Sequence, residues 1–349
     1  MLRPLILIVL MALAPGWARS QKLKTVVPEK PVLLFPIKQA GKWGYIDNAG
    51  KLAVALQFDS AGVFSEGLAA VRLGDKYGFI DPAGKYVIDP LLLYADAFSE
   101  GLAAVGVVGK DGSGSYCYIN KAGKIVVSFK KVKPEDIGGV YRFSQGLARV
   151  NIQDKYRFID KTGKFIGIQK FDWAGDYSDG LAPVKIKQAG YVVEKLSCGY
   201  INKTGKMVIK PQFDDGGPFV DGLARVKTGG KYGYINKIGK MVINPAFDDA
   251  QDFSQEMAGV KVEDKWGFIS KGGQQAIEPQ FLEVRPFSED LAGIKAGEVW
   301  GYADKTGKIA VDTQFDEVFK FSNGLGMIKN DGDYGYINKN GESIWEPVE

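Results

Sequence analysis

One short phrase recurs nine times along this chain of 349 residues and constrains the fold more than any other feature. In the sixth copy it runs from Lys231 to Asn236, with the letters KYGYIN. Five of the eight spacings between copies are 34 residues, and the others are 39, 40 and 42. Such a period is typical of solenoids, propellers and arrays. The copies begin at Trp43, Tyr77, Tyr116, Tyr156, Cys198, Tyr232, Trp266, Trp300 and Tyr334.

The order of residues within a copy predicts short strands joined by tight turns. Trp43 and Tyr45 would share one face of a strand, and Gly44 and Ile46 the other. Gly at the place of Gly44 recurs in seven copies, so we expect a neighbouring sheet to pack closely there. The second aromatic is present in every copy, and a Gly always follows five residues later. These aromatics are Tyr45, Phe79, Tyr118, Phe158, Tyr200, Tyr234, Phe268, Tyr302 and Tyr336.

The turns give each copy the form of a meander. Asp47 can open a turn that Gly50 closes with a positive φ. An aliphatic strand such as Met207–Ile209 follows, and a fourth short strand is expected around Phe213 or Phe247. The phrase Phe-Ser-x-Gly-Leu-Ala, as at Phe98–Ala103, predicts a turn that delivers Leu and small residues into a crowded inner strand.

This order resembles propeller blades and predicts an all-β fold of nine tandem repeats of about 34 residues. Val32–Ile37 would be the small-residue strand of the first copy, with Thr25–Val27 as its outermost partner, and Ser343–Trp345 would close the ninth. Propellers have about four to eight blades. An open superhelical β-solenoid therefore stays as the alternative.

The N-terminus predicts a cleaved signal peptide over residues 1–20. Arg3 supplies a positive charge, Leu5 to Ala14 are apolar, and cleavage would follow Ala18 or Ser20. The repeat domain would then occupy residues 21–349 with no further membrane span. We expect secretion or export to the periplasm.

Composition narrows the function. The 45 basic and 41 acidic side chains give a charge of +4 without a basic cluster, so nucleic acid is not expected as a partner. The absence of His removes His-based triads and most zinc sites. We predict no catalytic, cofactor-binding or metal-binding residues and no cofactor.

Several residues have both a structural and a functional interpretation. Periodic Asp residues could hydrolyse glycosides or bind calcium, but their recurrence favours a turn device, as does the lack of a calcium-binding nonapeptide. The first aromatic of the phrase could stack on sugars or peptides, but its regular spacing favours a core role. Cys117 and Cys198 are expected to be buried free thiols rather than a disulfide. The periodic residues are Asp59, Asp214, Asp248 and Asp316.

Three segments interrupt the regular period. Residues 106–115 and 187–197 lengthen the same turn in copies three and five, and residues 128–143 enlarge a different connection. Insertions in repeat proteins map to loops, often on a binding face, although loops also drift freely.

These residues resemble the WG-repeat family, also written KWG repeats, of mostly bacterial proteins. Lys42–Asp47, Lys265–Ile269 and Phe64–Ala69 carry the resemblance, which covers essentially the whole mature chain. It implies a β-repeat module without a common activity. Cys117 and Arg157 depart from it, because each replaces the repeated Gly.

Together these features predict a non-enzymatic binding or scaffold protein that recognises a protein, peptide or glycan. A carboxylate-based hydrolase of polysaccharide and a structural spacer stay as alternatives.

Overall fold

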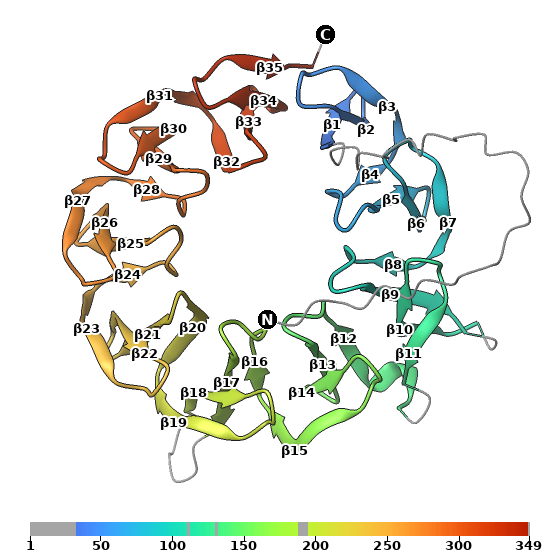
Figure 1. The fold of residues 1–349 in the computed structure, drawn as a ribbon, viewed down its shortest axis with the longest axis horizontal. Helices are drawn as coiled ribbons and strands as arrows, with labels where there is room; N and C mark the ends of the chain where they lie inside the picture. Colours follow the sequence, from blue (N-terminus) through green and yellow to red (C-terminus); the bar gives the residue numbers. More distant parts are fainter. Residues whose placement is uncertain (1–32, 110–111, 130–131, 188–194, 348–349) are drawn as a thin grey trace, which may run out of the picture. The chain divides into compact units, whose positions relative to one another are not determined.

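The computed structural model describes residues 33–109, 112–129, 132–187 and 195–347, which form nine antiparallel sheets. Each sheet consists of consecutive strands, and the sheets follow one another around a ring (Figure 1). The fold is therefore an all-β propeller, as predicted, with nine blades that we number in chain order. Blade 1 has three described strands and each other blade has four. The predicted signal peptide and the strand expected at Thr25–Val27 lie outside the described residues.

The strands take one of four places in a blade, and Figure 1 shows the fourth strands on the outside of the ring. The innermost strands are β4 (Ser60–Ala61), β8 (Tyr94–Ala95), β12 (Ile137–Val140), β16 (Trp173–Ala174), β20 (Asp215–Val220), β24 (Asp249–Ala250), β28 (Glu283–Val284) and β32 (Glu317–Ser322). The second strands are β1 (Phe35–Gln39), β5 (Ala69–Leu73), β9 (Leu102–Val108), β13 (Leu147–Ile152), β17 (Leu181–Lys187), β21 (Leu223–Thr228), β25 (Met257–Val262), β29 (Leu291–Ala296) and β33 (Leu325–Asn330).

The third strands carry the repeated phrase, and the fourth strands are the aliphatic ones. The third strands are β2 (Lys42–Ile46), β6 (Lys76–Ile80), β10 (Gly114–Asn120), β14 (Lys155–Asp160), β18 (Leu196–Asn202), β22 (Lys231–Asn236), β26 (Lys265–Ser270), β30 (Val299–Asp304) and β34 (Asp333–Asn338). The fourth are β3 (Leu52–Phe58), β7 (Tyr86–Leu92), β11 (Ile125–Ser128), β15 (Phe165–Phe171), β19 (Met207–Phe213), β23 (Met241–Phe247), β27 (Gln275–Phe281), β31 (Ile309–Phe315) and β35 (Ser343–Trp345). The helical element η1 (Pro134–Asp136) is a single 3₁₀ turn, and no described helix is long and apolar enough to cross a bilayer.

The fourth strand of the meander exists and lies close to its predicted place. Phe213 and Phe247 are the last residues of the outer strands β19 and β23. The additional strand begins two residues later and pairs with the next blade, as Asp249 does with Lys261. The strand that receives Leu and the small residues, predicted as an inner strand, is second from the inside.

The predicted turn between the third and fourth strands is confirmed. Asp47 Oδ1 accepts hydrogen bonds from the amides of Ala49 and Lys51, each at 2.9 Å. Gly50 follows with a φ of 81°, a conformation that costs Gly little because it lacks a Cβ atom.

The repeated Gly of the phrase has a different reason from the one expected. A Cβ atom on Gly44 would lie 2.5 Å from the carbonyl oxygen of Val54, which is on the outer strand of the same sheet. The register shifts here, because Trp43 pairs with Phe58 while Tyr45 pairs with Val54. A β-bulge in the blade's own outer strand, rather than a neighbouring blade, therefore excludes a side chain.

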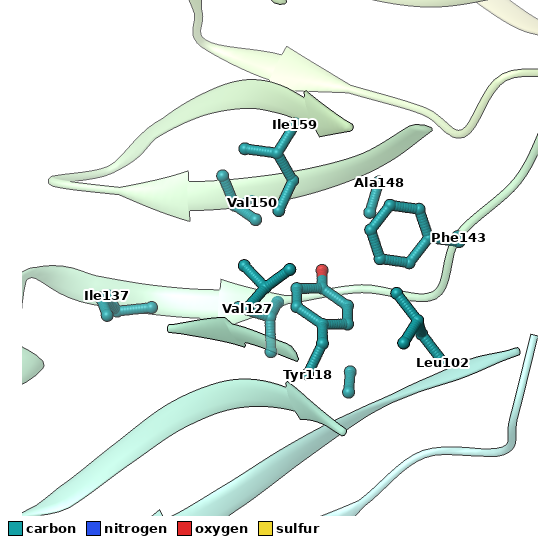
Figure 2. Packing of buried hydrophobic residues seen from close by; sticks show 10 residues of the cluster. Leu102, Tyr118, Val127, Ile137, Phe143, Ala148, Val150 and Ile159 are labelled. Carbon is teal, nitrogen blue, oxygen red and sulfur yellow. The ribbon is translucent and has the colours of Figure 1, made fainter. Parts of the chain in front are cut away.

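The second aromatic of the phrase packs successive blades together, as predicted. All nine of these side chains are buried, with at most 5% of their surface exposed. Figure 2 shows one such interface, where Tyr118 of blade 3 lies among Phe143, Val150 and Ile159 of blade 4. The Tyr118 hydroxyl also donates to the carbonyl oxygen of Tyr141 at 2.7 Å, so a buried polar group is satisfied across the blade boundary.

The ring closes through side chains. The Tyr336 hydroxyl of blade 9 donates to the carbonyl oxygen of Pro36 in blade 1 at 2.9 Å. The rings of Tyr336 and Phe35 meet edge to face with centroids 5.5 Å apart, and Ile37 and Ile46 join the same cluster. The open superhelical alternative is therefore not the fold.

Candidate interaction surface

Antiparallel strands place the connections of every blade on two opposite faces of the ring. Turns between the second and third strands share a face with the links from an outer strand to the next blade, which we call the insertion face. Turns between the first and second strands share the other face with turns between the third and fourth, which we call the turn face. Contacts agree with this division, because Glu66 of one turn-face connection pairs with Lys121 of another at 3.2 Å.

The enlarged connections belong to the insertion face, as the strands on either side of each one show. Residues 106–115 and 187–197 belong to the hairpins β9–β10 and β17–β18, whose strands have seven residues each. The enlarged segment 128–143 includes the link from β11 to β12, with η1 just before β12, and β12 itself. Because these connections belong to blades 3, 4 and 5, the departures from the repeat gather on one sector of one face.

On this face, a regular connection between blades carries an Asp carboxylate that accepts hydrogen bonds from a Lys side chain and from a main-chain amide of the next blade; we call this arrangement a charged clamp. Asp59, between blades 1 and 2, accepts hydrogen bonds at 2.7 Å from Lys42 Nζ and from the amide of Gly74 in the next blade. The Lys42 ammonium group lowers the pKa of Asp59, because its hydrogen bond favours the carboxylate. Asp214 and Asp248 likewise accept a main-chain amide of the following hairpin. The interpretation of these three residues as turn devices is confirmed, and Asp316 occupies the same connection.

Basic side chains cover the first aromatic of the phrase. Seven of the nine blades place Lys or Arg directly opposite that position on the second strand. Lys295 Nζ, for example, lies 5.8 Å from the centroid of the Trp300 ring. The first aromatic is thus half-buried in most blades rather than fully in the core. The seven basic residues are Lys38, Arg72, Lys185, Lys227, Lys261, Lys295 and Lys329.

Blade 3 lacks both charged features. Leu93 stands at the Asp position between blades 2 and 3, and Gly106 stands opposite Tyr116 in place of the basic residue. Tyr94 packs edge to face on Tyr116 instead, with centroids 6.3 Å apart. A Cβ atom on Gly106 would lie 3.2 Å from the Cβ of Tyr94, so the small residue makes room for that ring.

The result is an exposed apolar area that we call the blade 3 patch: Leu91, Leu93, Tyr94 and Val108. The exposed fractions of Leu91 and Val108 are 73% and 52%, and those of Leu93 and Tyr94 are 38% and 40%. The sequence analysis found the neighbouring insertions but missed this patch. Comparing the charge at equivalent positions of the repeats would have found it. Leu93 stands at a position that is usually Asp, and Gly106 at a position that is usually Lys or Arg.

The two cysteines are buried and free, as predicted. Burial raises the pKa of Cys117 to about 11 and that of Cys198 to about 12. Cys117 stands at the place of the repeated Gly and pairs with Ser128 on an outer strand of only four residues. Arg157, at the same place in blade 4, stacks 3.7 Å from the centroid of Phe165. The departure in blade 3 therefore comes with a shortened outer strand, whereas the outer strand β15 of blade 4 keeps seven residues.

Comparison with known proteins identifies the repeat. No curated protein matches the chain. Similar solved structures include a eukaryotic initiation factor with a TM-score of 0.64, at 12% identity over 90% of this chain and 95% of that one. Sqt1 of Saccharomyces cerevisiae has a TM-score of 0.42, at 10% identity over 88% of this chain and 98% of that one. The first of these likenesses supports the propeller fold alone.

A family model described as WG containing repeat matches seven segments of the chain. They are residues 43–77, 77–110, 156–188, 199–232, 232–266, 266–299 and 300–332. Residues 111–155, which include Cys117 and the enlarged link to blade 4, fall between two matches. Because the matched segments make up most of the sequence, the chain belongs to the family of proteins with WG-containing repeats.

Proposed function

We propose that this protein is an exported, non-enzymatic binding scaffold that captures an apolar segment of a protein or peptide on its insertion face. The β-propeller fold is consistent with a binding or scaffold role. The observation that carries the proposal is the replacement of charged clamps by the blade 3 patch, next to the enlarged connections. Contiguous exposed apolar side chains on an otherwise charged surface mark interaction sites.

The site can be tested with peptides selected from a random library on the wild-type protein. We expect them to be rich in apolar residues and to bind the double variant Leu93→Asp, Val108→Asp at least about tenfold more weakly, because a charge in an apolar contact must be desolvated. Ile238→Asp is the matched control, since Ile238 is 79% exposed and lies on the turn face. Equal binding of the peptides to the double variant would contradict the proposal.

The repeated carboxylates support a non-enzymatic role. Asp59, Asp214 and Asp248 each hold a main-chain amide and a Lys side chain in equivalent connections, as a structural device does. A spacer would depend on repeat number alone. Clean removal of residues 232–265, one unit, leaves the blade 3 patch in place, so retained peptide binding separates the two roles.

Export is a separate part of the proposal and has its own test. The full chain should reach the periplasm or the medium of a bacterial host, and a chain that begins at Gln21 should stay inside. Mass spectrometry of the exported protein should show a new N-terminus after Ala18 or Ser20. An exported fraction that retains Met1 would contradict cleavage.

A further inference from the structure

The turn before each outer strand, together with the start of that strand, differs in charge between two parts of the ring. In blades 3 to 6 these nine-residue stretches contain nine Lys, one Asp and no Glu. The equivalent stretches of the other five blades contain six Lys and eight Asp or Glu; they are residues 47–55, 81–89, 270–278, 304–312 and 338–346. The lysines recur with the repeat period rather than in a run, so only the fold brings them together. The basic stretches, which we call the basic arc, are residues 120–128, 160–168, 202–210 and 236–244.

The stretches of the basic arc touch one another, because each turn packs on the outer strand of the preceding blade. A Cβ atom on Gly163 would lie 2.8 Å from the Val127 side chain, and one on Gly239 would lie 3.1 Å from the Ile209 side chain. A Cβ atom on Gly205 of blade 5 would lie 3.5 Å from the main chain of blade 4. The outer strands β11, β15, β19 and β23 follow one another on the outside of the ring (Figure 1). The arc is therefore one continuous surface, where the turn face meets the outer wall.

Most of the positive charge of the arc is not neutralised. Three of its lysines pair with acidic side chains of neighbouring turns, as Lys237 does with Asp179 at 3.5 Å. The single acid of the arc, Asp160, accepts hydrogen bonds from two amides of its own turn. The other six lysines are exposed and form no ion pair with a described residue. They are Lys124, Lys164, Lys203, Lys206, Lys210 and Lys240.

Two isoleucines add exposed apolar surface to the same arc. Ile168 and Ile238 are 92% and 79% exposed, the highest values for large apolar side chains in the described part of the chain. At the position of Ile238 the other copies have Ala, Gly, Thr or Asn, and at that of Ile168 they have Ala or a polar or charged residue. Both isoleucines therefore depart from the repeat in the blades that carry the unpaired lysines.

Ile168 lies in an enlarged bulge of the outer strand. In blade 6 the third residue of that strand, Ile243, pairs with the second aromatic, and three residues separate it from Phe247. In blade 4 the second residue, Ile166, takes that place, so four residues lie between it and Phe171. The bulge adjoins the turn of blade 5, since a Cβ atom on Gly205 would approach it. The apolar side chain thus stands beside the lysines of that turn.

We propose that the basic arc binds the surface of a membrane that contains anionic lipids. The unpaired lysines attract the headgroups, and the side chains of Ile168 and Ile238 enter the boundary between headgroups and acyl chains. A second copy of this chain suits the surface less, because two basic arcs would repel each other. Docking on this side of the turn face leaves the insertion face free, so the inference goes beyond the proposed function and does not depend on it.

The probe is a vesicle of phosphatidylglycerol and phosphatidylcholine in equal amounts, and binding of the mature protein is measured by co-sedimentation. We expect binding to these vesicles but not to vesicles of phosphatidylcholine alone, and weaker binding as salt screens the charges. The double variant Lys206→Gln, Lys240→Gln should bind at least about tenfold more weakly. Lys51→Gln, Lys308→Gln is the matched control and should bind like the wild type, because both residues occupy the same repeat position outside the arc.

The apolar part of the proposal has its own pair of variants. Ile168→Ser, Ile238→Ser should weaken binding about threefold to tenfold, because less apolar surface enters the membrane. Leu52→Ser, Ile309→Ser, which removes exposed apolar side chains outside the arc, should leave binding unchanged. Thermal unfolding shows that each variant is folded.

Two results would overturn the proposal. One is equal vesicle binding by either double variant and its control. The other is binding of a short DNA duplex that is as tight as vesicle binding and is lost in the lysine variant, because the arc would then be a nucleic-acid surface. Neither result would affect peptide binding at the blade 3 patch, so the two proposals can fail separately.

Discussion

The boundary between blades 7 and 8 and the boundary between blades 9 and 1, which we call the seam, join their blades through different contacts. At the regular boundary Phe287 belongs to a turn and packs on Phe268, and the Ser254 hydroxyl donates to the carbonyl oxygen of Phe287. At the seam Phe35 belongs to a strand and packs on Tyr336, and the Tyr336 hydroxyl donates to the carbonyl oxygen of Pro36. An aromatic contact is therefore common to both boundaries, although the aromatic side chain comes from a turn in one and from a strand in the other.

The largest expected difference concerns the aromatic side chains. Phe287→Ala should lower the free energy of unfolding by about 3–5 kcal/mol, because it leaves an enclosed cavity. Phe35→Ala should cost less, since Phe35 lines a cavity beside the seam that water can enter. Urea unfolding of both variants tests this, and a larger loss for Phe35→Ala would show that the seam is the more tightly packed boundary.

The tyrosine hydroxyls should behave alike at both kinds of boundary. Tyr234→Phe and Tyr336→Phe each leave a carbonyl oxygen, of Gln251 or Pro36, without its donor. Each should therefore cost about 1 kcal/mol of unfolding free energy. A negligible cost at Tyr336 alone would mean that its bond to Pro36 does not help to close the ring.

Loss of the serine hydroxyl, unlike loss of the tyrosine hydroxyl, should affect the regular boundaries more than the seam. Ser288 donates to the carbonyl oxygen of Phe321, so Ser288→Ala should cost about 0.5–1.5 kcal/mol. Among the described residues Ser322 donates to no main-chain carbonyl oxygen, so Ser322→Ala should lower the melting temperature less than Ser288→Ala does. A matching loss in both variants would place Ser322 in an unrecognised structural contact.

The smallest expected effect is a pH dependence. Burial raises the pKa of Glu66, but hydrogen bonds from Lys121 and Gly101 outweigh it and hold the pKa below its usual 4.5. A lowered pKa stabilises the fold above pH 4.5, and that contribution is lost as the pH falls through the folded value. Exchange of the Gly101 amide should then accelerate relative to amides near the seam, where Asn323 occupies the equivalent position. Glu66→Gln should flatten this dependence, and an unchanged dependence would assign it to another carboxyl group.

The sequence was sufficient to predict the blades because their determinants are local and repeated. Alternation around Trp43, the turn at Asp47 and Gly50, and the invariant second aromatic each act within one copy. The role of Gly44 was predicted incorrectly, because a β-bulge depends on the register of two strands, which periodicity alone does not reveal. Ring closure could not be predicted either, since it depends on how Phe35 meets a residue from the far end of the chain.

The candidate surfaces were harder to predict from the sequence than the blades. The insertions were visible, but their common face follows only from the antiparallel order of the strands. The blade 3 patch depends on single residues, Leu93 and Gly106, that look unremarkable until they are compared with the same position in other blades. A cavity of about 410 Å³ beside the seam is lined by residues distant in sequence, such as Phe64 and Phe319, which the folded ring brings together.

The composition of the sheets has a consequence for how this architecture can be rearranged. Every sheet is made of neighbouring strands, so no blade in the described part of the chain is shared between its two ends. Circular permutation at a link between blades would leave all strand pairings intact and would only move the covalent break. Closure at the seam would then become a covalent connection, and any other boundary could be examined in its place.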